Sequence, residues 1–308
     1  QDKESQRWLN SLELTAQRIP SDIPWIMVGD READIYELFM LAYTDQANFL
    51  VRAAQNRVVQ LNHTASETLL LETAIGQIPV SGQVELEVCR TPERAPRSVT
   101  LSVRFATLEL QPPRNRPRQD GLLPLPVQVI LAEEECPPAG EEAIRWLLLT
   151  TLEVNDLQDA RQCLRWYSYR WLIERYHYVL KSGCHIEQLQ LETADRIERA
   201  LATYAIVAWR LLWLTYLMRQ CPEQACDNVF EPNEWQALYC TIHHTSVLPL
   251  IPPTLHECVR WIAQLGGFIG RKGDGEPGVK TIWRGLKRLH DIAQTWQLAH
   301  LESGHFSC

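Results

Sequence analysis

The stretch WYSYRWLIERYHYVLK, residues 166–181, carries the most informative pattern in this chain of 308 residues. Its periodicity predicts one helix, on which Tyr167, Arg170, Glu174 and Lys181 lie within about 60° of one another on a helical wheel. The other side of that helix is apolar and suited to burial, with Leu172, Ile173, Tyr176, Val179 and Leu180. The pattern therefore places a carboxylate, two cations and a phenol on one face.

Two interpretations of this face remain open. A carboxylate such as Glu174 suits a hard divalent cation, and Arg, Lys and Tyr one or two turns apart suit successive phosphates of a nucleic-acid backbone. The alternative is a solvated helix face whose charges pair at a spacing of four residues. Wheel geometry by itself does not decide between the two.

Residues 24–37, PWIMVGDREADIYE, hold a second carboxylate in an informative place. The apolar run 25–28 predicts a short strand, Gly29 ends it, and a helical pattern follows. Asp30 is thus expected at the carboxyl end of a strand, where α/β sheets gather their functional groups. Alternatively, Asp30 only caps the helix that follows it.

Together these segments resemble the bacterial cut-and-paste DDE transposases of the insertion-sequence-four group, which includes the transposon-five transposase. The resemblance rests on DREADI at residues 30–35 and on the signature formed by Tyr167, Arg170, Glu174 and Lys181. Three further motifs extend it over nearly the whole chain: DKES with WL at residues 2–9, RWLLLT at 145–150 and QLGGF at 264–268.

The resemblance implies a ribonuclease-H-like core with three acidic metal ligands. Asp30 matches the second of these ligands and Glu174 matches the third. The first should lie well upstream of Gln1, and it has no match in the segment before Asp30. The chain is therefore expected to be the C-terminal part of a longer protein or a truncated gene product.

The same resemblance implies which residues contact DNA. Tyr167, Arg170 and Lys181 are expected to hold the DNA backbone near the scissile phosphate, and Arg31 is added to them because it neighbours the metal site. In the family, the Trp that matches Trp146 stacks on a base flipped out of the element's end, which is a known use of aromatic side chains. Without the resemblance, a Trp that opens an apolar strand is expected in the core.

The activity implied is metal-dependent cleavage and transfer of DNA strands, by two-metal phosphoryl transfer. Mg²⁺ is the expected ion, with Mn²⁺ as a substitute. The expected partners are DNA, at the element's ends and at the target, and a second copy bound through the C-terminal helices. The alternative is a catalytically inactive truncated chain, either a dimerising inhibitor or a decayed relic. The expected location is the bacterial cytoplasm, in association with the nucleoid.

The expected fold class is α/β, with a ribonuclease-H-like core interrupted by a β-rich insertion and followed by an α-helical dimerisation region. Strand-like alternation between Pro-rich turns predicts the insertion. Four segments are expected. Residues 1–54 form the part of the core with Asp30, and residues 55–152 form the insertion. Residues 153–220 form the part of the core with the signature helix and a long helix, and residues 221–308 form the dimerisation region.

The last segment is predicted to contain two amphipathic helices, at 254–265 and 280–298, the first of them stopped by Gly266 and Gly267. The second carries an apolar stripe at gaps of three and four residues, made of Ile282, Leu286, Leu289, Ala293 and Trp296. The stripe suits packing within the subunit as well as packing against a second copy.

Composition sets outer limits on the function. A hydrophobic content of 45% and a charged content of 22% are those of an ordinary globular chain. The net charge of −8 weighs against a nucleic-acid protein, although basic residues cluster at 114–118 and 271–288. The apolar stretch 200–218 is nearly long enough to cross a bilayer, but charges precede and interrupt it, so a core helix is expected and no membrane partner.

The nine cysteines give no repeated CxxC framework, and their number is odd. Reduced thiols are therefore expected rather than a disulfide scaffold. One group with loose zinc-ligand spacing remains open: Cys221, Cys226, Cys240 and His243.

Overall fold

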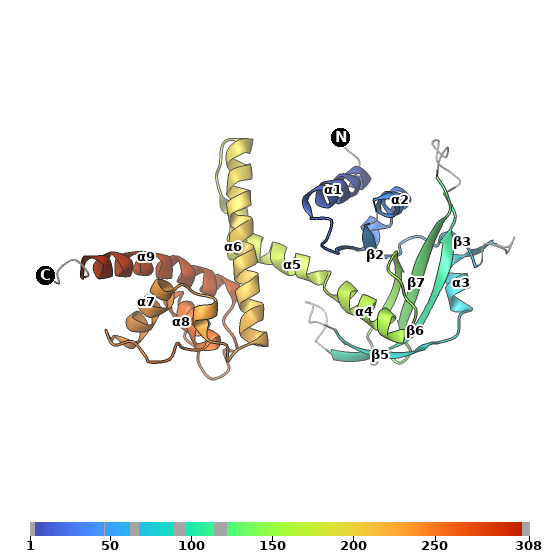
Figure 1. Cartoon of the computed structure of the whole chain (residues 1–308). Coiled ribbons are helices and arrows are strands. Elements are labelled where there is room, and N and C mark those ends of the chain that lie inside the picture. Colours follow the sequence, from blue (N-terminus) through green and yellow to red (C-terminus); the bar gives the residue numbers. More distant parts are fainter. Residues whose placement is uncertain (1–3, 46, 62–67, 89–96, 114–121, 304–308) are drawn as a thin grey trace. The chain divides into compact units, whose positions relative to one another are not determined.

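The computed structural model describes residues 4–45, 47–61, 68–88, 97–113 and 122–303, and the chain falls into two compact units (Figure 1). Unit 1 spans Gln1–Arg170 and unit 2 spans Trp171–Cys308. The basic cluster at 114–118 lies outside the described residues.

The described part of unit 1 contains a mixed set of helices and strands. In chain order they are α1 (Glu4–Arg18), β1 (Ile26–Gly29), η1 (Arg31–Ala33), α2 (Tyr36–Thr44), β2 (Asn48–Arg52), β3 (Val58–Gln60), β4 (Thr68–Leu70), α3 (Leu71–Gly76), β5 (Gly82–Val88), β6 (Arg97–Leu110), β7 (Leu125–Glu134), β8 (Arg145–Thr150) and α4 (Leu157–Ser168).

The described part of unit 2 is helical. Its elements are α5 (Trp171–Tyr178), η2 (Val179–Gly183), η3 (Ile186–Gln188), α6 (Ala194–Gln220), η4 (Cys226–Asn228), α7 (Pro232–His243), α8 (Leu255–Leu265) and α9 (Val279–Ser303). Here η2 is a π-helical turn, whereas η1, η3 and η4 are 3₁₀ turns.

Unit 1 is built on one sheet with the strand order β1-β2-β8-β7-β6-β3-β4, and β5 also pairs with β6. Strands β1 and β2 are parallel and are joined through α2, whereas β8 runs antiparallel to β2. The strands expected in the segment 55–152 are thus confirmed. They continue the sheet that begins with β1 and β2, so all the described strands of unit 1 belong to one sheet.

Helices cover both faces of this sheet, which explains why consecutive residues in the middle of its central strands are apolar and buried. In β2, Phe49 and Val51 join the core beneath α1, α2 and α3, whereas Leu50 joins the core beneath α4. Strand β8 alternates in the same way, because successive strand side chains point to opposite faces. Figure 1 shows α1 and α2 lying next to each other in this unit.

In unit 2, two glycines let α8 and α9 cross closely. A Cβ on Gly266 would lie 1.9 Å from the carbonyl oxygen of Thr281, and one on Gly285 would lie 1.7 Å from that of Ile262. Both distances are far below van der Waals contact, so only glycine fits at either position. The predicted helix stop is confirmed, because α8 ends at Leu265 with Gly266 as its C-cap.

The apolar stripe of α9 packs within the subunit. Ile282, Leu289 and Ala293 are 0%, 1% and 4% exposed, and Leu286 packs at the edge of the same core. Of the two uses left open for this stripe, the structure supports intramolecular packing.

One helix of the described chain, α6, is long and apolar enough to cross a membrane by length and composition. Its residues Ala208, Leu211 and Leu214 are fully buried in the core of unit 2, where they contact neighbouring helices. Other apolar residues of the helix, Ile206 and Trp209, are 70% and 57% exposed, so only one side of α6 belongs to the core.

The single helix expected over residues 166–181 is wrong. Helix α4 ends at Ser168, α5 runs from Trp171 to Tyr178, and Lys181 lies in the π-helical turn η2. The break has a tertiary cause: the chain leaves the core beneath the sheet, where Tyr167 is buried, and enters the separate core of unit 2, where Leu180 is buried. The apolar periodicity of the sequence does not show that its residues belong to two different cores.

Candidate functional site

Asp30 lies where the sequence places it, directly after β1. Its predecessor Gly29 has to be glycine, because an added Cβ would lie 2.5 Å from the Cβ of Ala33 in the following turn. The Asp30 side chain caps that turn by accepting a hydrogen bond from the Glu32 amide at 2.9 Å through Oδ1. Its Oδ2 lies 3.8 Å from Nη1 of Arg170, and the side chain is 40% exposed. One carboxylate oxygen therefore caps the turn, and the other faces a cation.

Tyr167 lies at the centre of the charged groups beside Asp30. It is only 5% exposed, which corrects the expectation that its phenol stands on an open helix face. Burial raises the pKa of Tyr167, and the nearby Arg52 and Arg170 oppose that rise. The phenol therefore stays protonated and can donate a hydrogen bond throughout the physiological range.

Arg52 is a member of this group that the sequence analysis missed. It ends β2 beside β1, hydrogen-bonds with Tyr167, and donates to the carbonyl oxygen of Arg145 at 2.8 Å. Burial lowers the pKa of Arg52, and the charges of Arg31 and Arg170 lower it further. Arg31 and Arg170 thus lie close enough to Arg52 to repel it, and Arg170 also faces the Asp30 carboxylate. The available signal was an arginine at the end of a largely apolar strand, NFLVR, next to the strand that precedes Asp30.

A cavity of about 370 Å³ opens beside Arg52. Its charged lining consists of Arg31, Arg52, Arg145, Glu72 and Glu142. Arg145 is paired with Glu133 at 2.8 Å and with Glu72 at 3.5 Å. The predicted DNA-contacting residue Arg31 therefore lies at the mouth of a polar cavity, close to Asp30 in the chain and to Arg52 in space.

Trp146 lies on the same side of unit 1. Its ring meets the ring of Tyr167 edge-on, with centroids 5.0 Å apart and planes at 72°. The indole is partly buried against the core beneath α4. It is thus a partly accessible aromatic side chain in contact with the charged group around Asp30.

Glu174 and Lys181 belong to unit 2. Glu174 lies in the first turn of α5 and is exposed. Lys181 is 59% exposed at its side chain and pairs with Glu187 at 3.1 Å. Lys181 itself lies in the π-helical turn η2, so the regular helical wheel that grouped it with Glu174 does not apply.

No group of three or more His, Cys, Asp and Glu side chains that could hold a metal occurs in the part of the chain that the structure describes. Of the cysteines considered for zinc, Cys221 is exposed, whereas Cys226 and Cys240 are buried. Cys258 donates a hydrogen bond to Cys226, which lowers the pKa of the Cys226 thiol and raises that of Cys258. These two thiols are therefore each other's partners.

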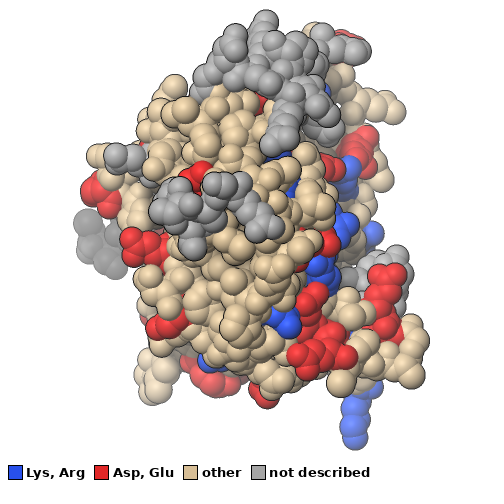
Figure 2. Space-filling model, turned by 90° about the vertical axis from the view of Figure 1, so that its right-hand side faces the viewer, with Lys and Arg blue, Asp and Glu red and all other residues tan. Residues whose placement is uncertain are grey.

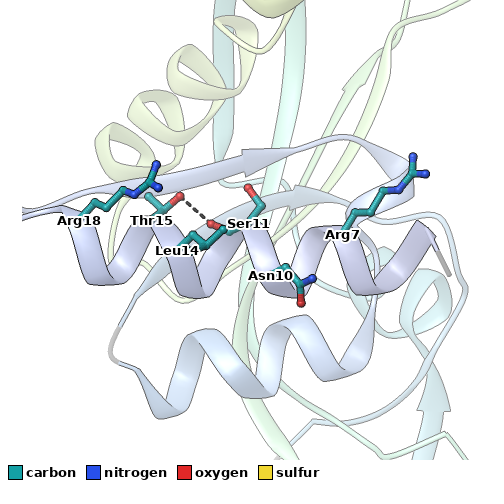
Figure 3. Close-up of a pocket in the computed structure, with 6 residues that line it drawn as sticks. All are labelled: Arg7, Asn10, Ser11, Leu14, Thr15 and Arg18. Carbon is teal, nitrogen blue, oxygen red and sulfur yellow. Dashed lines mark hydrogen bonds between the residues drawn. The ribbon is translucent and has the colours of Figure 1, made fainter. Parts of the chain in front are cut away.

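A second hollow, of about 400 Å³, lies along α1 (Figure 3). Every residue that lines it comes from that helix: Arg7, Asn10, Ser11, Leu14, Thr15 and Arg18. The two arginines stand at opposite ends, and the hydroxyl of Thr15 bonds back to the Ser11 carbonyl at 2.7 Å. This lining contains no carboxylate.

On the face of the molecule shown in Figure 2, positively charged side chains are concentrated in one region. On the face shown in Figure 2, Lys and Arg side chains gather in a narrow band beside several carboxylates, and most of the other described surface is uncharged. The net charge of −8 thus coexists with a local concentration of Lys and Arg side chains on this face.

Two family models match the chain. The one described as "Transposase DDE domain" matches residues 7–210, which is more than half of the 308 residues. The one described as "Transposase Tn5 dimerisation domain" matches residues 206–303. The chain therefore belongs to the DDE transposase family, and the resemblance read from the sequence is confirmed. Its N-terminal part is a ribonuclease-H-like transposase domain, and its C-terminal part is a helical dimerisation domain.

Proposed function

We propose that this protein is a cut-and-paste DNA transposase, which cleaves strands at the ends of its own element and joins them to target DNA. The observation that carries the proposal is the Asp30 carboxylate at a strand end, 3.8 Å from Arg170, in a chain of the DDE family. A strand-end carboxylate among arginines suits both a metal ion and the phosphodiester that the ion would polarise.

Members of this family use divalent metal ions, and we propose Asp30 and Glu174 as two ligands. Their donor chemistry fits, since both present hard carboxylate oxygens from side chains that solvent reaches. Mg²⁺ prefers such oxygens, and Mn²⁺ can replace it. When bound, the ion would act as a Lewis acid at the scissile phosphate.

The arginines around Tyr167 are proposed to hold the DNA backbone. Arg52 and Arg170 repel each other in the free protein, because both lie beside one buried phenol. A phosphate between them would relieve that repulsion and accept charge-assisted hydrogen bonds. Arg31 and Lys181 are proposed to contact further phosphates.

Trp146 is proposed to stack on an unpaired base. Its ring is fixed edge-on by Tyr167, so the indole is already oriented before DNA binds. Such pre-orientation reduces the entropy lost on binding, and stacking of a base on an aromatic ring is tolerant of sequence.

The dimer is proposed to form through the C-terminal helices, with the exposed apolar face of α6 as the contact for a second copy. Ile206, Trp209 and Trp213 are 70%, 57% and 37% exposed, and the two indoles stack in parallel with centroids 5.8 Å apart. All three lie inside the matched dimerisation region. Large aromatic side chains exposed together are typical of interface anchors.

The activity can be tested by Mg²⁺-dependent nicking of a labelled duplex that carries the DNA flanking the coding sequence. Nicking should be lost in Asp30→Ala and in Glu174→Ala. It should persist in Asp22→Ala, a matched control because Asp22 is an exposed carboxylate of the same unit.

Equal activity in all variants would refute the proposed roles of Asp30 and Glu174. Absence of nicking, together with mixed dimers and inhibition of an active relative, would support the inhibitor instead. Action on chromosomal DNA would place the protein at the bacterial nucleoid.

A further inference from the structure

Asp34 is the second aspartate of the segment DREADI, and its side chain is completely buried, with 0% exposure. A buried carboxylate is costly unless hydrogen bonds and an opposite charge compensate it. Such a group therefore requires an explanation through its partners.

Both carboxylate oxygens of Asp34 are occupied by the segment that follows β2. Oδ2 accepts from the amides of Ala54 at 2.7 Å and Gln55 at 2.8 Å. Oδ1 accepts from Nε of Arg57 at 2.9 Å and from its Nη2 at 2.6 Å. The backbone oxygen of Asp34 also accepts from Arg57, at 2.7 Å. We call these four residues the Asp34 network.

Arg57 also holds the Asp34 network in place through contacts with residues outside it. The guanidinium of Arg57 lies 5.9 Å from the ring centroid of Tyr36 and 5.8 Å from that of Phe39. Both rings are fully buried. The carbonyl of Arg57 also accepts from the Leu71 amide at 2.8 Å, so the segment after β2 is held on several sides.

The Asp34 network joins two segments that carry proposed site residues. Asp34 follows the turn that Asp30 caps, and Ala54 follows β2 two residues after Arg52. The carboxylate thus ties the turn with the proposed metal ligand to the segment that leads away from the proposed phosphate-binding arginine. All of these bonds are short, those from Arg57 are buried and those from Ala54 and Gln55 are partly buried, so a shift of one segment would break bonds to the other.

We infer that Asp34 is a positioning residue, which fixes Asp30 and Arg52 relative to each other so that one phosphodiester can meet both. This inference rests on the proposed function for the roles of Asp30 and Arg52. Asp34 itself touches neither DNA nor metal, because no part of its side chain reaches the surface.

The two halves of the network can be separated by mutation. In Asp34→Asn the amide offers one acceptor where four donors converge, so its NH₂ group must face either the two backbone amides or the guanidinium. In Arg57→Gln the carboxylate keeps its bonds from Ala54 and Gln55. Both variants lose the buried ion pair and become less stable. Only in Asp34→Asn are the bonds from the Ala54 and Gln55 amides also lost or weakened, because no carboxylate remains to accept them.

The first measurement is the binding of a fluorescein-labelled duplex by anisotropy across a KCl series, below each variant's unfolding transition. Arg52→Met is the reference, with an expected loss of about 1 in the slope of log K against log [salt]. Asp34→Asn should show the same loss, whereas Arg57→Gln should retain the wild-type slope. Glu134→Gln is the remote control, because Glu134 forms another buried pair, with Arg97.

The second measurement is hydrogen exchange of the Glu32 amide, which donates to Asp30 and touches no part of Asp34. It should exchange faster in Asp34→Asn than in Arg57→Gln or Glu134→Gln.

Two results would overturn the inference: exchange of the Glu32 amide at the wild-type rate in Asp34→Asn, or a loss of salt slope in Arg57→Gln equal to that in Asp34→Asn. If Asp34→Asn does not fold, a slope loss in Arg57→Gln still overturns it. Absence of duplex binding by the wild type would overturn the proposed DNA contacts, and the exchange measurement would still test Asp34.

Discussion

Replacing Arg52 by methionine removes one cation from the group around Asp30 and keeps most of the side-chain volume. A hydrogen bond to a charged group contributes roughly 1.5–3 kcal/mol. The lower end is expected here, because Arg52 already donates to the carbonyl oxygen of Arg145 at 2.8 Å, so a phosphate would compete with an existing partner. A loss of about 1.5 kcal/mol corresponds to roughly tenfold weaker DNA binding.

The salt dependence gives a second, independent number. Each phosphate neutralised by a cation contributes about 0.9 to the slope of log K against log [salt]. Arg52→Met should therefore lower that slope by about 0.9 between roughly 50 and 200 mM KCl, as measured by anisotropy of a labelled duplex. The control is Arg199→Met, because Arg199 is 80% exposed on α6 and pairs only within its own helix, with Asp195.

The reasoning would be refuted if Arg52→Met bound the duplex with the wild-type slope. It would also fail if Arg199→Met lost as much affinity as Arg52→Met, since a general loss of charge would then explain both. A tenfold loss without a change of slope would mean that Arg52 acts through packing, by supporting Tyr167, and not through a phosphate.

Three further predictions concern stability and assembly. Gly285→Ala should destabilise unit 2 by roughly 3 kcal/mol or more in thermal unfolding, because the new Cβ would lie 1.7 Å from the carbonyl oxygen of Ile262; an unchanged transition would contradict the close crossing. The pKa of Tyr36 is raised by burial to about 12, so folding stability should fall as pH rises from about 10 towards 12, and this loss should be smaller in Tyr36→Phe, as followed by urea unfolding. The double variant Trp209→Ala/Trp213→Ala should sediment as a monomer in analytical ultracentrifugation, with an unchanged melting temperature of unit 1. Dimers that persist in this variant would exclude the α6 face as the interface.

The strand with Asp30 could be predicted because its signals are local. An apolar run, a glycine and an aspartate follow one another, and the structure places Asp30 at the end of β1 as expected. The ends of α8 were predictable for the same reason, since Thr254 caps its start and Gly266 its end. In each case the deciding atoms lie within a few residues of one another.

The grouping of the site could not be predicted in the same way. The periodicity of residues 166–181 suggested one helix, but the chain changes from one core to another at that point, and Tyr167 is buried while Glu174 is exposed. Similarly, the apolar stripe of α9 is compatible with two uses in the sequence, and only the neighbouring helices show that it packs within the subunit.

The sequence by itself determined the family, the order of the elements and the identity of the proposed ligands, because motifs and turn signals depend on neighbouring residues. Only the tertiary structure brought Arg52 to Tyr167, where α4 packs against β2, and tied Asp34 to Ala54, beyond the parallel pair of β1 and β2. Parallel strands are joined by a long crossover, so residues that face each other across the sheet are far apart in the chain. Their partnership is a property of the strand register, and no local pattern records it.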